Sequence, residues 1–179
     1  HDHVEFLFEN EKIIYNDPRR FGSIHLTDDI DKHRLINHLG PEPLSKEFNS
    51  KYLFDLCSNS KTNIKTMLMN QKNVVGIGNI YASETLYLSK IYPLKDSSKL
   101  TFNECKKVVS SSKKILNAAI KVGGTTLKDF YSADGSPGYF KFKLNAYGRE
   151  DSDCKKCKTK IKKVTINKRA TYFCPSCQN

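Results

Sequence analysis

Several features that define whole classes of protein are missing from this 179-residue sequence. No apolar run approaches the ~20 residues needed to span a bilayer, which excludes a membrane-spanning helix. We expect no secretory signal, because His1 to Glu9 is charged and already alternates like a strand. No internal repeat or low-complexity tract is present, and the 38% of hydrophobic residues can bury a core. A wholly disordered chain is therefore excluded, and the length suits one domain or two small ones.

Acidic residues are absent from the last 26 positions, which hold seven lysines and one arginine. This segment, residues 154 to 179, carries +8 of the net charge of +11, and the first 153 residues carry only 22 − 19 = +3. A basic segment of this kind implies a polyanionic partner. The alternative is a lysine-rich face kept for solubility.

Four cysteines in the basic segment form two CxxC pairs separated by sixteen residues: Cys154, Cys157, Cys174 and Cys177. Two residues between thiolates let one tight turn aim both sulfurs at a single ion, and the second pair completes a tetrahedron around zinc. Two disulfides are the alternative, but disulfides are rare in the reducing compartment that we expect for this chain. The spacing therefore predicts one structural zinc ion, whose four ligands leave no open position for chemistry.

The residues between the two cysteine pairs alternate as in a β-hairpin, over Lys160 to Asn167 and Ala170 to Phe173. Asn167, Lys168 and Arg169 are expected at its tip. Because the tip of a metal-pinned hairpin is rigid, Arg169 is well placed to grip a phosphate.

Two alternating runs near the N-terminus, Val4 to Phe8 and Lys12 to Tyr15, predict a β-hairpin, and Gly22 to Leu26 is expected to add a third strand. Three short strands make half of a sheet core at best, and an isolated small sheet is marginal in water. The chain also begins with histidine and not methionine. We therefore expect a preceding β-rich segment, although processing would equally explain the absent methionine.

Apolar spacing predicts helices around Phe48 to Cys57, from Ile64 after a cap at Asn63, and from about Ile80 to Lys90. Thr101 and Glu104 have capping-box spacing and open the clearest helix, which Gly123 and Gly124 end. Cys57 and Cys105 fall on apolar helical positions, so we expect them to pack in a core.

A glycine-containing segment, Gly76-Ile77-Gly78-Asn79, precedes the third of these helices. Glycines just before a helix N-terminus expose backbone N–H groups and the positive end of the helix dipole, which together suit a phosphate. The segment lacks the third glycine and the preceding parallel-sheet unit of a dinucleotide fingerprint. A plain turn is therefore the alternative.

Two further segments combine turn-forming residues with residues that can bind a ligand. The seven residues from Ser132 to Gly138 suit either a connector or a mobile loop that closes over a ligand. The segment Asp17-Pro18-Arg19-Arg20-Phe21-Gly22 sets two arginines beside a phenylalanine. In a DNA-binding protein, arginine donates to base edges and an apolar ring fills a gap in the base stack. The alternative is a surface turn with a buried phenylalanine.

The order of these motifs resembles that of one enzyme family. The motifs are DPRRFG, HLGPEPL at His38 to Leu44, VVGIGNIYASE at Val74 to Glu84, GGTTLKDF at Gly123 to Phe130, DGSPGYF and the four-cysteine segment. Together they cover nearly the whole chain and are similar to the formamidopyrimidine-DNA glycosylase family. The related endonuclease VIII branch shares the helical and zinc parts, but DPRRF and the glycine-rich loop before Tyr139 favour the formamidopyrimidine branch.

The resemblance implies an α+β multidomain fold in three parts. Residues 1–40 would be the remnant of an N-terminal β-sandwich, 41–150 a helix-two-turns-helix DNA-binding domain with a lesion-recognition loop, and 151–179 a zinc-finger β-hairpin. It also implies a monomer that binds damaged double-stranded DNA and no membrane, in the bacterial cytoplasm with the nucleoid.

The family excises oxidised purines, chiefly 8-oxoguanine and formamidopyrimidines, and cleaves the abasic strand by β,δ-elimination. By motif, Arg19 would hydrogen-bond the cytosine left unpaired, and Phe21 would wedge into the stack. Gly78 and Asn79 would seat a phosphate that Arg169 also grips, with Lys65 approaching the lesion side. The loop residues Ser132, Asp134, Gly135, Gly138 and Tyr139 would close on the flipped base. A wedge, phosphate clamps and a base pocket are the features that offset the cost of base flipping.

One departure from the family concerns the chemistry. The family's nucleophile is the amine of an N-terminal proline, which forms a Schiff base with the sugar, and the next residue is a glutamate. Here His1 and Asp2 match an interior position of the family pattern, so no catalytic residue is assigned in this chain. The hypotheses are therefore a bifunctional glycosylase/lyase whose chemistry lies in a preceding segment, and a non-catalytic zinc-dependent module that binds damaged or abasic DNA. A zinc-ribbon transcription or ribosomal protein would leave DPRRF unexplained.

Overall fold

The structure is a computed structural model that describes residues 1–124 and 143–178. Its contacts divide the chain into two units, His1–Asn37 and His38–Asn179, which are described separately. The expected lesion-recognition loop, with Ser132, Asp134, Gly135, Gly138 and Tyr139, lies outside the described residues.

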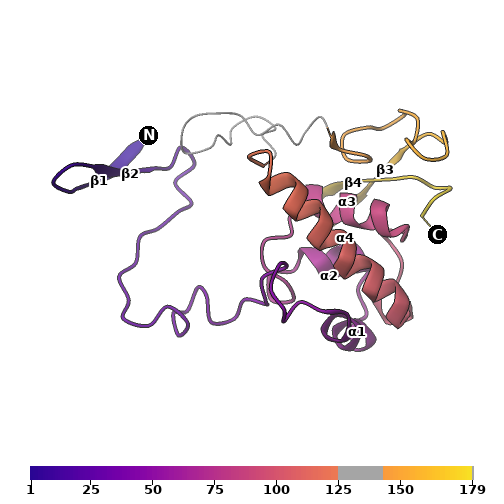
Figure 1. Cartoon of the computed structure of the whole chain (residues 1–179), viewed down its shortest axis with the longest axis horizontal. Helices are drawn as coiled ribbons and strands as arrows, with labels where there is room; N and C mark the ends of the chain where they lie inside the picture. Colours follow the sequence, from indigo (N-terminus) through magenta and orange to yellow (C-terminus); the bar gives the residue numbers. More distant parts are fainter. Residues whose placement is uncertain (125–142, 179) are drawn as a thin grey trace. The chain divides into compact units, whose positions relative to one another are not determined.

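The first unit contains the predicted hairpin. Strand β1 (Asp2–Leu7) pairs antiparallel with β2 (Lys12–Asn16) (Figure 1). The third strand expected over Gly22 to Leu26 was wrong, because these residues form no strand. The Asp17 carboxylate accepts a hydrogen bond from the Gly22 N–H at 2.7 Å and bends the chain after β2. The described part of this unit is thus a two-stranded sheet, and the β-sandwich stays a prediction.

In its described residues, the second unit contains four α-helices and one short 3₁₀ helix. They are α1 (Ser50–Ser58), α2 (Ile64–Met69), α3 (Asn79–Ser89), η1 (Ser97–Lys99) and α4 (Phe102–Ile120). The side chains of Asn49, Asn63 and Thr101 cap α1, α2 and α4, each accepting from a backbone N–H of the first turn. The capping box predicted at Thr101 and Glu104 is confirmed. These caps explain where the helices begin.

The core of the second unit joins all four helices. Apolar residues of α1, α2, α3 and α4 are buried together, among them Leu53, Leu68, Leu86 and Val108. Cys57 and Cys105 are 1% and 0% exposed within this core, as predicted. Helix α3 is buried along most of its length because α2, α4 and the C-terminal hairpin all pack against it.

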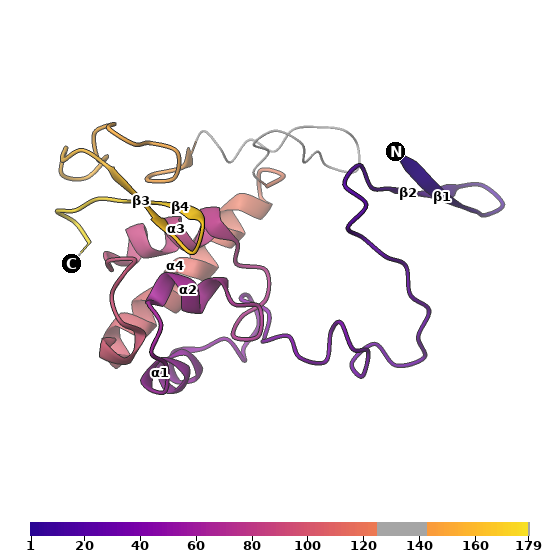
Figure 2. The ribbon, with the colours of Figure 1, turned by 180° about the vertical axis from the view of Figure 1, so that it is seen from behind.

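The C-terminal hairpin consists of β3 (Lys162–Ile166) and β4 (Arg169–Phe173). Asn167 and Lys168 form the turn with positive φ angles of 47° and 60°. Arg169 is therefore the first residue of β4 and pairs with Ile166. The sequence pattern had placed it in the turn itself. Strand β4 packs against α3, as the view from behind also shows (Figure 2).

A buried carboxylate joins α3 to the segment before the zinc-finger hairpin. Glu84 is 0% exposed and accepts hydrogen bonds from the backbone N–H groups of Asn145, Ala146 and Tyr147 at 2.7 to 2.8 Å. The Asn145 side-chain amide donates a fourth bond at 3.0 Å. The charge is therefore well satisfied although it is buried.

No helix among the described residues combines the length and the hydrophobicity that crossing a bilayer demands.

Candidate functional site

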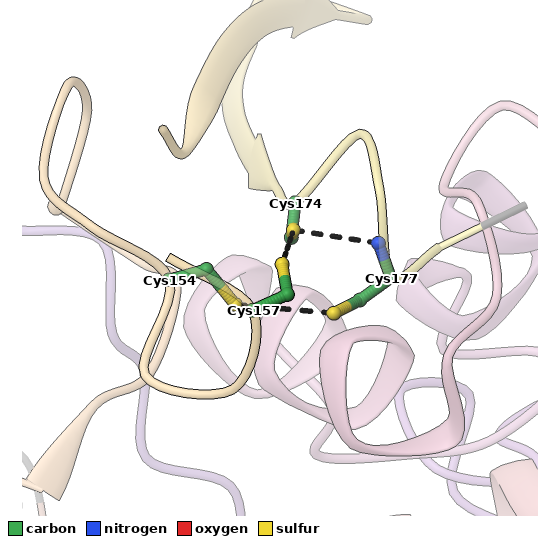
Figure 3. A group of neighbouring side chains, drawn as sticks. All are labelled: Cys154, Cys157, Cys174 and Cys177. Atoms are coloured by element: carbon green, nitrogen blue, oxygen red, sulfur yellow. Dashed lines mark hydrogen bonds between the residues drawn. The ribbon is translucent and has the colours of Figure 1, made fainter. Parts of the chain in front are cut away.

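The four cysteines of the two CxxC pairs converge at one point. Cys154 and Cys157 come from one loop and Cys174 and Cys177 from another, and their sulfurs face one another (Figure 3). All four Sγ atoms lie within 4.8 Å of one another. The Sγ–Sγ distances are 3.9 Å for Cys154–Cys177 and 3.4 Å for Cys157–Cys174. A tetrahedron with Zn–S bonds of about 2.3 Å has edges of about 3.8 Å, so these residues fit zinc and not the alternative of two disulfides.

The cysteine loops carry their own backbone donors. The Lys156 N–H donates to Cys154 Sγ and the Cys177 N–H to Cys174 Sγ, both at 3.4 Å. Gln178, 2% exposed, accepts from the Cys174 N–H at 2.8 Å and donates to the Ile91 carbonyl at 2.9 Å. The second loop is thereby tied to the chain just after α3.

A polar seam joins the zinc-finger hairpin to α2 and α3. We use "seam" for the contact made by Lys65 of α2, Asn79 of α3, and Ala170 and Thr171 of β4. Lys65 Nζ donates to Asn79 Oδ1 at 2.6 Å and to Thr171 Oγ1 at 2.5 Å. Asn79 Nδ2 donates to the Ala170 carbonyl at 3.0 Å. Two residues expected to face DNA, Lys65 and Asn79, are thus brought together.

Arg169 lies at the same place. A cavity of about 280 Å³ beside the seam is lined by residues of α2 and of the hairpin: Lys65, Thr66, Met69, Asn70, Ile166, Asn167 and Arg169. Asn167 Nδ2 donates to Thr66 Oγ1 at 3.0 Å and so fixes the hairpin turn on α2. Lys65 is 1% exposed, and this burial, with a smaller effect of the positive Arg169, lowers its pKa to about 8. Two basic groups are therefore held beside one open cavity.

The glycine segment before α3 presents an open helix N-terminus. Gly76 has a φ of +80°, a conformation that favours glycine. Gly78 is the N-cap of α3 and has no side chain to occupy the first N–H groups. Ile77, between them, is 3% exposed and anchors the segment in the core. The N–H groups at the start of α3 are thus not covered by a cap, as a phosphate seat requires.

In the first unit, Asp17 organises the turn that carries Arg19 and Phe21. Its carboxylate accepts from the backbone N–H groups of Gly22 and Arg19, the latter at 3.1 Å, and from the Tyr15 hydroxyl at 3.0 Å. A Cβ atom at Gly22 would collide with that hydroxyl. The Arg19 guanidinium lies 4.7 Å from the Phe21 ring centroid, and Phe21 is 80% exposed. The alternative of a buried phenylalanine was therefore wrong.

Sequence reasoning missed two functional contributors. Thr171 is 0% exposed and receives the Lys65 ammonium, and Glu84 holds the segment that leads to the zinc finger. In the sequence, Thr171 is only a hydroxyl at an inward position of a strand, and Glu84 is only a glutamate inside an apolar helix. Neither feature by itself indicates a partner or a role. Both residues acquire their roles from contacts across more than 60 positions of sequence.

Comparison with protein-family models identifies both halves of the second unit. The model described as "Formamidopyrimidine-DNA glycosylase H2TH domain" matches residues 39–131, more than half of the chain, and "Zinc finger found in FPG and IleRS" matches residues 153–179. The chain belongs to the formamidopyrimidine-DNA glycosylase family. The family's zinc finger and the four-thiol geometry agree on one structural zinc ion.

Individual Fpg proteins extend the match to the first unit. Formamidopyrimidine-DNA glycosylase of Hydrogenovibrio crunogenus is 52% identical over 180 residues, which cover 99% of this chain and 64% of that protein. The protein of the same name from Haemophilus influenzae is 49% identical over 179 residues, covering 99% and 66%. The chain thus spans just under two thirds of the length of these curated relatives.

Solved Fpg structures share the fold. MutM (Fpg) from Thermus thermophilus has a TM-score of 0.88 at 33% identity, covering 99% of this chain and 68% of that one. Lactococcus lactis Fpg in complex with DNA containing an abasic site also has a TM-score of 0.88, at 36% identity, covering 100% and 66%. The Fpg family therefore accounts for both the helical domain and the zinc finger of this chain.

Proposed function

We propose that this chain is the DNA-binding and lesion-reading part of a base-excision repair glycosylase/AP lyase that acts on oxidised purines in duplex DNA. The proposed substrate class, 8-oxoguanine and formamidopyrimidines, is the one that the family resemblance implies. A relative from Lactococcus lactis was solved with DNA that contains Fapy-dG, which supports this class of lesion.

The observation that carries the proposal is that Lys65 and Arg169 line one cavity and that Lys65 is hydrogen-bonded to Asn79. The Arg169 guanidinium and the uncapped N-terminus of α3 supply donors that a DNA phosphate accepts, and the buried Lys65 ammonium adds a positive charge beside them. We assign Gly78 and Asn79 to the phosphate beside the flipped nucleotide, Arg169 to the same phosphate, and Lys65 to the lesion side.

The remaining assignments belong to other parts of the chain. Arg19 would read the base opposite the lesion and Phe21 would fill the vacated stack, which suits the exposure of that ring. The loop with Ser132, Asp134, Gly135, Gly138 and Tyr139 would enclose the flipped base. We retain the three-part division at residues 1–40, 41–150 and 151–179, with one protein molecule bound to each lesion.

The chemical step would use an amine that condenses with the sugar C1′ as the base leaves, followed by β,δ-elimination. In the family this amine belongs to an N-terminal proline assisted by a glutamate, and neither is matched by His1 and Asp2. We therefore assign no nucleophile within these residues and expect the 179 residues alone to be inactive. The zinc ion holds the hairpin and takes no part in this step, because four cysteines leave no open coordination position.

The phosphate clamp is tested by the salt dependence of DNA binding. Arg169→Ala should weaken binding to every duplex sequence. It should also reduce the slope of the logarithm of the binding constant against the logarithm of the salt concentration by the contribution of about one phosphate contact, because counterion release scales with the number of phosphates neutralised. Lys168→Ala is the matched control, since it removes one positive charge from the adjacent position in the hairpin turn, outside the cavity. Fluorescence anisotropy across a salt series measures both slopes. An unchanged slope in Arg169→Ala would remove Arg169 from the clamp.

A non-catalytic module that binds damaged DNA is the second candidate, and the comparisons do not favour it because the relatives are named as glycosylases. Borohydride trapping on an 8-oxoguanine duplex separates the two ideas. Efficient covalent trapping by these 179 residues alone would show that a nucleophile lies within them and would contradict the assignment above.

A further inference from the structure

Helix α3 places a buried tyrosine in the core of the zinc finger. Tyr87, 1% exposed, lies near the C-terminal end of the helix and packs in the core of the finger with Ala146, Cys154, Ile161 and Cys174. It contributes both an aromatic ring and a hydroxyl to this core. Such a hydroxyl normally needs a hydrogen-bond partner when it is buried.

The partner of the Tyr87 hydroxyl is a zinc-ligating sulfur. The oxygen lies 3.2 Å from Cys154 Sγ. A cysteine that binds zinc is a thiolate without a proton, so the tyrosine is the donor and the sulfur the acceptor. The Lys156 ammonium lies 5.2 Å from the centroid of the same ring. The ring quadrupole attracts this cation, which helps to hold the tyrosine ring in place.

We propose that Tyr87 is a positioning residue of the zinc site, whose hydroxyl holds the Cys154 thiolate and fixes the zinc finger to α3. Groups that hydrogen-bond to metal ligands orient them and commonly change metal affinity by about 10–100-fold. This role concerns zinc retention, and it does not depend on the proposed action on oxidised purines.

The position of Tyr87 on α3 gives this bond a structural consequence. Asn79, at the first position of the same helix, binds the Ala170 carbonyl of β4. The two residues are eight positions apart along the helix, which corresponds to a rise of about 12 Å at about 1.5 Å per residue. The zinc finger is therefore fastened to α3 at two points, through the zinc ligand Cys154 and through the seam.

The test is zinc retention by the full chain without DNA. Tyr87→Phe keeps the ring and removes only the hydroxyl, and we expect zinc transfer to a chromogenic chelator to be at least about tenfold faster than in the wild type. Tyr92→Phe is the matched control, because Tyr92 packs against the finger through its ring, 5.1 Å from the Phe173 ring centroid. This control should release zinc at the wild-type rate.

A second substitution should change the rate of zinc release in the opposite direction. It retains the buried hydroxyl, so it also serves as the test if Tyr87→Phe fails to fold. Difluorotyrosine incorporated at position 87 is a stronger donor than tyrosine and should slow zinc release. Replacing zinc with cobalt adds a direct readout, because the sulfur-to-cobalt charge-transfer bands should shift when a hydrogen bond to a ligating sulfur changes. Wild-type release rates and unshifted cobalt bands in the folded variants would overturn the proposal. Since no DNA is present, this outcome would leave the proposed function untouched.

Discussion

Lys65 shows how a charged side chain can be buried with all of its hydrogen bonds satisfied. Its ammonium has three acceptors in Asn79, Thr171 and the Ala170 carbonyl, the last at 3.4 Å. These bonds satisfy the donor, but they do not restore the hydration that burial removes. Its pKa therefore falls to about 8 from the ordinary value of 10.5. The lysine stays mainly protonated at neutral pH, as an interaction with phosphate requires.

This lowered pKa predicts a pH-dependent stability. Because the folded-state pKa lies below the unfolded one, the cost of burying the charge is fully present below pH 8 and is relieved as the pH rises toward 10.5. The free energy of unfolding of the wild type, relative to Lys65→Met, should rise by about 2 kcal/mol between roughly pH 7.5 and 9.5. Urea denaturation at both pH values measures the difference.

Lys65→Arg is the control for this titration, because its guanidinium stays protonated across the whole range. Its stability relative to Lys65→Met should not change with pH through this site. A wild-type difference that is flat, or that falls with pH, would contradict a lowered pKa at Lys65.

The individual site residues differ in how far the sequence could predict them. The cysteine spacing was sufficient for the zinc site because the two CxxC pairs encode the ligand geometry locally. Asn79 and Arg169 could be singled out from the glycine segment before α3 and from the hairpin between the cysteine pairs. The partners of Lys65 could not be predicted, since Thr171 lies 106 positions away and the packing of both α2 and β4 against α3 brings the two together.

At the scale of the element, α3 organises the second unit. Its N-terminus supplies Asn79, its middle supplies Glu84, and its end supplies Tyr87. The side chains of these three residues reach the seam, the segment 145–147 and the zinc site. A helix buried on nearly all sides is expected to be apolar throughout, and the polar residues here are the ones that fasten it to the zinc finger.

Glu84 is predicted to be the most sensitive of the side chains that fasten α3. Glu84→Gln keeps the shape, but it places an amide N–H group against backbone N–H donors and removes the charge that they stabilise. We expect the free energy of unfolding to fall by about 3 kcal/mol. Urea denaturation of the zinc-loaded chain measures it.

Glu150→Gln is the matched control for this loss. Its carboxylate forms an ion pair with Lys163 at 2.8 Å, and the two side chains are 45% and 39% exposed. Exposed pairs contribute about 1 kcal/mol or less. Equal losses in the two variants would show that the buried carboxylate has no special role.

Among the elements, helices with side-chain caps were the easiest to predict, because Asn63 and Thr101 mark their starts in the sequence. The wrong third strand, Gly22 to Leu26, has the alternation of a strand but finds no ladder partner among the described residues. A strand needs a neighbour that local sequence does not specify. The Asp17 turn further directs this segment away from β2.

At the scale of the whole molecule, the zinc finger and the helical domain form one unit while the N-terminal hairpin forms another. The finger contributes four of the side chains at the proposed clamp and its cavity, namely Ile166, Asn167, Arg169 and Thr171. We therefore expect the proposed phosphate clamp to form only when the finger is folded.

We predict that removing zinc abolishes tight DNA binding but leaves the helices folded. A chelator should unfold the finger, because zinc binding supplies its folding energy, and should abolish tight binding to duplex DNA. The helical circular dichroism should largely persist, since α1, α2, α3 and α4 share an apolar core of their own. Anisotropy and circular dichroism on one chelator titration check both. Tight DNA binding by the metal-free chain would refute a clamp that depends on the finger.

The long sequence separation across the seam also has a consequence during synthesis. A ribosome adds roughly 5–20 residues per second, so Thr171 follows Lys65, 106 positions earlier, after roughly 5 to 20 s. During that interval the helices can already fold through their local contacts, but the ammonium of Lys65 has no β4 to receive it. We therefore expect the proposed phosphate clamp to form only after the hairpin has been synthesised and has docked on the helices.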